Sequence, residues 1–258
     1  MSSIFLLRSV SKNFTKNNSN LFRAMRQHDL LAKSVVNASN KYIVLPGAEN
    51  FPQSCFVGDN CVPLCKGIAV ATIPFDANRQ GESGLMRNFF DICEMSEELE
   101  QIYRVSPSQK CDGSNVLCIG NNVFVGANEQ TSESAHLYWK QICKRHNINY
   151  VPVPISDSSN LQSRVAWLGR DVGLFSQKNF IQCAKLICSH VDFDQKKIRF
   201  MNTIDMLRIN NTVLHNVDCD MLFFRKEFPH IQFKEIHLGA MGNKDALIAR
   251  SVATIYMN

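Results

Sequence analysis

Four pairs of short β-rich runs, each joined by a tight turn, constrain the fold of this chain more than any other feature of its sequence. Val, Ile and Phe in the runs suit a buried pleated sheet, and Gly and Asn in three of the turns accept the positive φ angles of tight hairpins. The pattern predicts four β-hairpins, with turns at residues 64–66, 120–122, 169–171 and 210–211. The paired runs are 54–62 with 67–73, 116–119 with 123–125, 165–168 with 172–175, and 206–209 with 212–215.

Helical stretches separate the hairpins. Apolar residues recur there at spacings of three and four, which is the period of an amphipathic helix. The predicted helices are 82–103, 131–146, 178–189 and 219–228. Thr131 is the predicted N-cap of the second helix, although Ser134 stands where a full capping box has Glu or Gln.

The last β-rich run, residues 246–255, adds a fifth unit. We expect the early 42–45 strand or its neighbours to complete its sheet. A unit of roughly forty residues used about five times predicts a closed, pseudosymmetric α/β array. An open mixed sheet of the α+β class is the alternative that the hairpins alone do not exclude.

The chain has 258 residues, of which 45% are hydrophobic, enough to bury the core of one large domain. The longest apolar stretches, such as 67–74, are broken within eight positions. A membrane-spanning helix needs about 18 apolar residues or more. The sequence therefore predicts no transmembrane segment.

The formal net charge of +5 is concentrated near the N-terminus, where five basic residues precede the first acidic residue, Asp29. Removing these five from the 28 basic residues leaves 23, which equals the number of acidic residues. Domains that follow a phosphate backbone carry a clustered basic excess, so no direct nucleic-acid partner is predicted. The five are Arg8, Lys12, Lys16, Arg23 and Arg26.

Ten cysteines occur without any Cys-x-x-Cys pair or compact disulfide framework. This usage favours a reducing compartment and free, mostly buried thiols. Two closer pairs, Cys61 with Cys65 and Cys183 with Cys188, lack a second pair at zinc-site spacing. We therefore predict neither a metal site nor a cofactor.

Residues 1–28 have the composition of a mitochondrial targeting peptide: no acids, spaced Arg and Lys, and many Ser and Asn. We predict an extension at 1–28, which is either a targeting segment or a flexible basic tail that contacts a partner, followed by one domain at 29–258. Apolar residues recur in the extension at helical spacing, at Leu7, Val10 and Phe14 and again at Leu21, Phe22 and Met25.

Several motifs, in collinear order over residues 50–258, resemble the dimethylarginine dimethylaminohydrolase family. Pro-Gln-Ser-Cys-Phe-Val-Gly-Asp at 52–59 is similar to the family's Pro-Asp-x-x-Phe-Val-Glu-Asp. Asp-Gly-Ser-Asn-Val-Leu at 112–117 is similar to its Asp-Gly-Gly-Asp-Val-Leu. Further similar segments are 74–82, 123–126, 151–153 and 247–252.

The resemblance implies the pentein fold, a five-bladed pseudosymmetric α/β propeller with its active site in the central channel. It also implies the family's chemistry, in which a cysteine attacks a guanidinium carbon, a histidine moves protons and carboxylates hold the cationic substrate. No cofactor is implied.

This chain departs from the family at the positions that carry that chemistry. Ala249 stands at the nucleophile position and Asn160 at the general-base position. A methyl group forms no thiolate, and an amide does not titrate near neutral pH. The substrate-holding positions also differ, with Gln53 for an Asp, Gly58 for a Glu and Gln130 for an Arg. The chain is therefore predicted to be a pseudoenzyme.

Asp59 and Arg79 are the substrate-holding residues that remain. We expect them to pair with each other, because isolated buried charges are costly. A second hypothesis is that they still hold an arginine-like ligand without turnover. A third is a hydrolase with relocated catalytic residues, drawn from Cys55, Cys61, Cys111, His215 and His237.

A retained framework around an emptied site favours a structural use of the fold. Our first hypothesis is a non-catalytic accessory subunit of a mitochondrial complex of the respiratory chain, the ATP synthase or the ribosome. Its partners would be the other protein subunits of that assembly.

Overall fold

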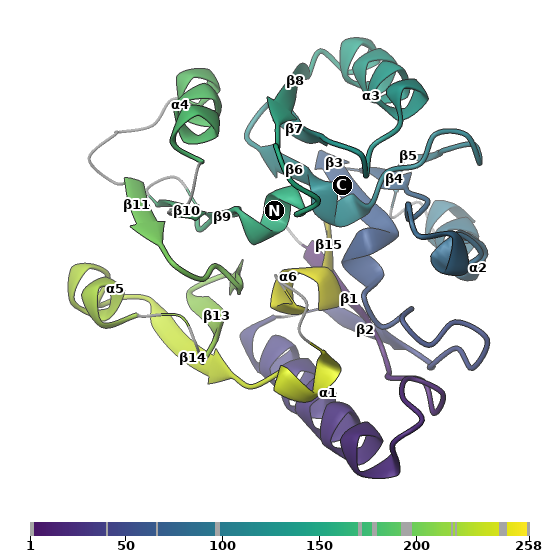
Figure 1. Cartoon of the computed structure of the whole chain (residues 1–258), viewed down its shortest axis with the longest axis vertical. Coiled ribbons are helices and arrows are strands. Elements are labelled where there is room, and N and C mark those ends of the chain that lie inside the picture. Colours follow the sequence, from purple (N-terminus) through teal and green to yellow (C-terminus); the bar gives the residue numbers. More distant parts are fainter. Residues whose placement is uncertain are drawn as a thin grey trace.

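The computed structural model describes residues 3–39, 41–65, 67–95, 99–169, 172–176, 180–191, 198–217, 219, 221–242 and 247–256. It contains five sheets of three strands each. Figure 1 shows the five sheets arranged around a common centre, with helices α1 to α5 on the outside and α6 near the middle. The prediction of five α/β units is confirmed at this level.

Four of the units repeat one order of elements, in which an antiparallel hairpin is followed by a helix and a third strand parallel to the second. Antiparallel pairing is therefore confirmed for all four predicted hairpins. The first run, predicted at 54–62, is corrected, because residues 57–59 form a 3-10 segment and the strand begins at Cys61. Residue 66 of the first predicted turn and residues 170 and 171 of the third lie outside the described residues. The first unit contains β3 (Cys61–Cys65), β4 (Ile68–Ala71), α2 (Glu82–Met95) and β5 (Gln101–Arg104), and the second contains β6 (Val116–Ile119), β7 (Asn122–Ala127), α3 (Glu133–Arg145) and β8 (Asn149–Pro154). The third contains β9 (Val165–Trp167), β10 (Gly173–Ser176), α4 (Ile181–His190) and β11 (Ile198–Met201). The fourth contains β12 (Met206–Ile209), β13 (Thr212–Asn216), α5 (Leu222–Glu227) and β14 (Gln232–Ile236).

The fifth unit joins the two ends of the chain. Its sheet has the order β15 (Ala253–Tyr256), β1 (Ser3–Arg8) and β2 (Tyr42–Leu45), and α1 (Asn18–Ala38) connects β1 to β2. The central strand β1 is antiparallel to β15 and parallel to β2. An N-terminal strand thus pairs with the C-terminal one, and the sheet depends on both.

The predicted division between an extension at 1–28 and a domain at 29–258 is corrected by this sheet. The boundary falls inside α1, and β1 lies at the centre of the sheet. The helical spacing expected for Leu7 is also wrong, because Ile4 to Leu7 are buried on both faces of a strand. A strand buried on both faces has a continuous apolar run instead of an alternating one.

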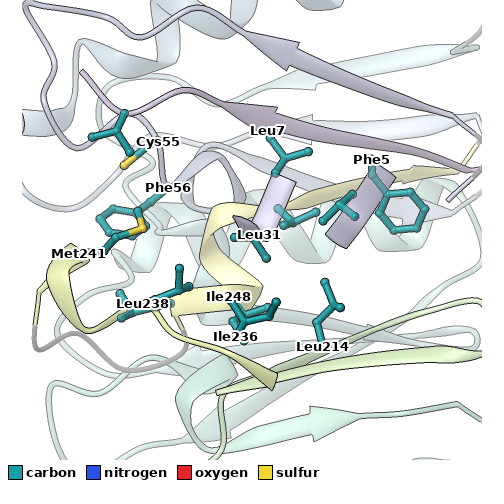
Figure 2. Close-up of a cluster of buried hydrophobic side chains, with 14 of the residues drawn as sticks. Phe5, Leu7, Leu31, Cys55, Phe56, Leu214, Ile236, Leu238, Met241 and Ile248 are labelled. Carbon is teal, nitrogen blue, oxygen red and sulfur yellow. The ribbon is translucent and has the colours of Figure 1, made fainter. Parts of the chain in front are cut away.

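Helix α1 begins after Asn17, whose Oδ1 accepts hydrogen bonds from the backbone N–H groups of Ser19 and Asn20. Its inner face reaches the same apolar cluster as β1, where Leu31 packs with Leu7 and Ile248 (Figure 2). This cluster joins the N-terminal helix to α6 (Leu247–Ser251), which carries Ala249.

Short helical segments immediately precede the first strand of four of the sheets. They are η1 (Val57–Asp59), η3 (Gly113–Asn115), η4 (Leu161–Ser163) and α6. In chain order, η1 contacts η3 and η3 contacts η4, while α6 contacts η1. They therefore form one layer at the centre of the molecule. Two further 3-10 segments, η2 (Ala77–Arg79) and η6 (Gly239–Met241), lie elsewhere in the chain.

Three further predicted boundaries are corrected. The 246–255 run is the helix α6 followed by β15, and residue 246 lies outside the described residues. The predicted 82–103 helix ends at Met95, and its last residues belong to β5. Ser132, not Thr131, caps α3 through a hydrogen bond from the N–H of Ala135. In the described part of the chain, no helix has the length and hydropathy that crossing a bilayer requires.

Candidate functional site

Ala249 and Gly58 meet where α6 packs on η1. A Cβ added to Gly58 would lie 2.9 Å from the carbonyl oxygen of Ala249 and 3.0 Å from that of Arg250. Both neighbours are backbone atoms, so they cannot rotate away. Position 58 therefore has room for glycine alone, and the Glu expected there from the family pattern would displace α6.

A cavity of about 1010 Å³ lies beside this contact, and the first strands of all five sheets line it. Gly58, Gln162 and Ala249 are among its lining residues. Arg208 is the single Lys, Arg, Asp or Glu among the described residues that line it. A site for a guanidinium group needs carboxylates, and none lines this cavity in the described part of the chain.

Asp59 is buried next to the cavity and is held by two arginines. Its Oδ2 lies 2.6 Å from Nη1 of Arg79, and its two oxygens accept from Nε (2.9 Å) and Nη2 (2.5 Å) of Arg250. The Asp59 side chain has 0% exposure. Asp59 therefore pairs with Arg79, as its sequence context predicts, and also with Arg250, which the sequence analysis missed.

Glu82 completes the charge network. Its carboxylate accepts from Nε (2.9 Å) and Nη2 (2.7 Å) of Arg79, and also from Nδ2 of Asn60 at 2.9 Å. Two buried carboxylates thus face two buried guanidinium groups. Such geometry, with nearly every oxygen hydrogen-bonded, is what a buried ion pair requires.

The network keeps Asp59 ionised in spite of its burial. Burial on its own would raise the pKa of Asp59, but Arg250 and Arg79 together lower that pKa well below its usual range. Burial likewise acts to lower the pKa of Arg79, and Asp59 and Glu82 raise it above its ordinary value. The guanidinium of Arg250 also lies 5.1 Å from the centre of the Phe56 ring. Asp59 is thus fully occupied by residues of its own chain.

Asp205 positions α6 and was also missed by the sequence analysis. Its Oδ1 accepts from the backbone N–H of Ile248 at 2.8 Å, and its Oδ2 accepts from Nδ2 of Asn216 at 3.0 Å. Burial raises the pKa of Asp205 to about 6, although backbone N–H groups of α6 act in the opposite direction. The carboxyl group therefore anchors the start of the helix that carries Ala249.

Asn160 and Gln130 belong to a second group around η4. Asn160 directly precedes η4, and its Oδ1 is buried without a hydrogen-bond partner among the described residues. Nε2 of Gln130 donates to the carbonyl of Ser158, in the loop that leads to Asn160. Segment η3 links the two groups, because Gly113 packs on the Gly58 carbonyl and Oδ1 of Asn115 accepts from the N–H of Leu161.

Gln53 contributes its backbone to the charge network. Its carbonyl accepts from Nη2 of Arg79 at 3.4 Å. The structure therefore brings Gln53, Gly58, Asp59, Arg79 and Ala249 together, while Asn160 and Gln130 lie across η3.

Neither Cys55 nor Cys111 provides an activated thiol near the centre. Burial raises the pKa of the Cys55 and Cys111 thiols to about 12. Thiols with such pKa values are almost entirely protonated at neutral pH and are poor nucleophiles. Cys61 lines the cavity, and the eight cysteines whose side chains the structure describes are free thiols. No His, Cys, Asp and Glu cluster suited to a metal occurs among the described residues.

Five three-stranded α/β units around a central layer define a class of α/β folds that also occurs in solved structures. A dimethylarginine dimethylaminohydrolase carrying an adduct with S-methyl-L-thiocitrulline matches with a TM-score of 0.80, at 15% identity over 98% of this chain and 100% of that one. The N-terminal domain of a cyanobacterial arginine dihydrolase, bound to its substrate, matches with a TM-score of 0.79, at 13% identity over 99% of both chains.

One relative found by sequence is the dimethylarginine dimethylaminohydrolase of Pseudomonas aeruginosa. It is 21% identical over 153 residues, which are 57% of this chain and 56% of that protein. The match thus spans about half the length of the relative. No protein-family model matches the chain. The predicted resemblance to the dimethylarginine dimethylaminohydrolases is confirmed, in sequence over part of the chain and in fold over nearly all of it.

Proposed function

We propose that this chain is a catalytically silent relative of the dimethylarginine dimethylaminohydrolases and serves as a structural accessory subunit of a mitochondrial multiprotein complex. The complex would belong to the respiratory chain, the ATP synthase or the ribosome. The observation that carries the proposal is the saturation of Asp59 by Arg79 and Arg250. The acidic residue retained from the substrate-holding pattern holds the protein's own guanidinium groups.

This chain lacks the reactive group at both the nucleophile position and the general-base position of the family pattern. Ala249 has no thiol with which to form a covalent adduct, and Asn160 has no group that exchanges protons near neutral pH. Cys55 and Cys111 are held protonated by burial, so neither replaces the nucleophile. These features support a fold kept without its reaction.

The retained architecture supports the structural part of the proposal. We take the five sheets to close into a five-bladed propeller of the pentein type, with the ββαβ order of elements in four blades and a fifth blade assembled from both ends of the chain. The N-terminal strand and helix form part of the last blade. A basic segment suited to mitochondrial import would therefore remain in the mature protein, because its removal would open that blade.

Binding of an arginine-like ligand without turnover has less support. The cavity offers Arg208 to a ligand but no carboxylate among its described lining residues. A second guanidinium group at Asp59 would have to displace Arg79 or Arg250 from a buried ion pair, which costs several kcal/mol, of the order of 3–5.

The absence of chemistry is tested with the purified full-length chain and its Ala249→Cys variant. We expect no citrulline release above the buffer blank from arginine or dimethylarginine, in either protein. The variant regains a thiol, but Asp59 stays paired and Asn160 supplies no base. Turnover by the wild-type chain that vanishes on replacing Cys55, Cys61 or Cys111 by Ser would establish the relocated hydrolase instead.

A further inference from the structure

The outward face of α1 carries an apolar and basic stripe. Ala24, His28, Leu31, Ser34 and Val35 occupy the buried side of this helix. On the opposite side, residues at spacings of four lie one above another along the helix axis. We define the α1 stripe as Phe22, Arg23, Arg26, Leu30 and Lys33, all of which are exposed.

Two large apolar side chains in the stripe lie in solvent. Phe22 is 70% exposed and Leu30 is 51% exposed. Strand β2, which contacts α1, exposes Tyr42 (47%) and Val44 (42%) in the same unit of the fold. Single exposed apolar residues are ordinary, but Phe22 and Leu30 lie on one helix face among basic residues, and two more exposed apolar residues lie in the same unit.

The formal net positive charge of the chain is concentrated in the segment that contains the stripe. Arg23, Arg26 and Lys33 belong to the stripe, and Lys12 and Lys16 precede the helix. Asp29 is the single acidic residue among residues 9–39, so the segment carries four of the chain's five formal net positive charges. Arg23, Arg26 and Lys33 form no ion pair within the described part of the chain.

We propose that the α1 stripe docks on an acidic surface of a partner protein, with Phe22 and Leu30 as apolar anchors and the three cations as a surrounding polar rim. The inference rests on the proposed function as a subunit. Aromatic and Arg side chains are enriched in the centres of protein interfaces, and complementary charge around them raises the association rate. The stripe has this composition.

An acidic protein surface suits the stripe better than a lipid surface. Helices that lie in a bilayer interface bury a continuous apolar face, and here the apolar face of α1 is already used in the core. Two outward apolar side chains separated by Arg26 are too few for stable insertion, whereas they suffice as anchors in an interface made of several elements.

The proposal is tested by carbodiimide cross-linking of the full-length chain in native extracts of its own cells. The reagent condenses a lysine amine with a carboxylate to an amide, and the water lost is taken up as the reagent becomes a urea. We expect peptides in which Lys33, Lys16 or Lys12 is joined to an Asp or Glu of one other protein. Cross-links to another protein that involve only lysines of α3, such as Lys140, would overturn the proposal.

A matched pair of variants gives the second measurement. The stripe variant, Arg26→Glu with Leu30→Glu, replaces one basic and one apolar residue of the α1 stripe by acidic residues. The control, Leu137→Glu with Lys140→Glu, makes equivalent changes on the exposed face of α3, where Leu137 is 57% exposed. We expect the stripe variant to lose its assembly-bound fraction by about tenfold or more and the α3 variant to keep it, with equal melting temperatures.

The outcomes separate the inference from the proposed function. A wild-type chain that runs free in native extracts would overturn both. An assembly-bound stripe variant, or equal loss in both variants, would overturn the docking surface alone. Flotation of the purified wild-type chain, but not of the stripe variant, with phosphatidylserine vesicles would assign the stripe to a lipid surface and overturn the protein partner.

Discussion

Replacing Asp59 with Asn is expected to lower the free energy of unfolding by about 3–5 kcal/mol, because Arg250 then keeps a buried charge without its partner. Arg79 keeps its ion pair with Glu82, so most of the destabilisation comes from Arg250, whose ion pair with Asp59 is lost. The side chains of Asp59, Arg79 and Arg250 are exposed by 0%, 5% and 6%, so water cannot replace the carboxylate. Urea unfolding of the wild-type and variant proteins measures the difference.

A surface pair provides the control. Arg104 and Asp91 are 2.6 Å apart, but their side chains are 35% and 49% exposed. Asp91→Asn is expected to change the free energy of unfolding by at most about 1 kcal/mol. Adding Arg250→Met to Asp59→Asn should recover part of the loss, since the uncompensated charge is then removed. Equal effects of Asp59→Asn and Asp91→Asn would contradict the described network.

Deleting residues 1–28 is expected to abolish folding. The deletion removes β1, whose Ile4, Phe5, Leu6 and Leu7 are all buried, together with the first half of α1. Burial of four such side chains contributes roughly 6–12 kcal/mol, which is comparable to the whole stability of a domain. Without β1, the strands β15 and β2 have no common neighbour. Soluble yield and thermal unfolding followed by circular dichroism measure the effect.

Two point variants separate the strand from the exposed part of the same segment. Leu6→Asp places a carboxylate at a position with 0% exposure and should prevent folding, whereas Phe22→Asp changes a side chain that is 70% exposed. The second variant should keep the wild-type melting temperature within a few degrees, as ordinary surface substitutions do. A truncated chain that unfolds cooperatively at the wild-type temperature would contradict the role of β1 and restore a separable extension.

Local chemistry explains which elements the sequence predicts well. The turns at Gly120 and Asn210 adopt positive φ angles, as glycine and asparagine there lead one to expect, and the hairpins follow from them. The N-terminal strand is missed because its two faces pack in different clusters, with Phe5 and Leu7 in one and Ile4 and Leu6 in the other. Residues buried on both sides of a strand show no period of two.

Tertiary contacts explain what the sequence did not predict at the site. The five residues of α6 are too few to form a helix alone, and Asp205 and the close fit of Gly58 hold them in place. Arg250 falls at an unspecified position of the family's Leu-x-Cys-x-Ser-Val pattern, which segment 247–252 resembles, so nothing local marks it as the second partner of Asp59. The missing thiol at Ala249, by contrast, can be predicted from the sequence motif around that position alone.

The native size of the endogenous protein shows whether it is a subunit of a large mitochondrial complex. Mitochondrial extracts would be prepared in a mild detergent, separated by native size and probed for this 29.2 kDa chain. We expect the chain to co-migrate with a large protein complex in a mitochondrial fraction. We also expect it to dissociate from that complex at high salt, which screens the charges of the α1 stripe. A chain that runs entirely as a free monomer at low salt, or that is absent from mitochondria, would contradict the account.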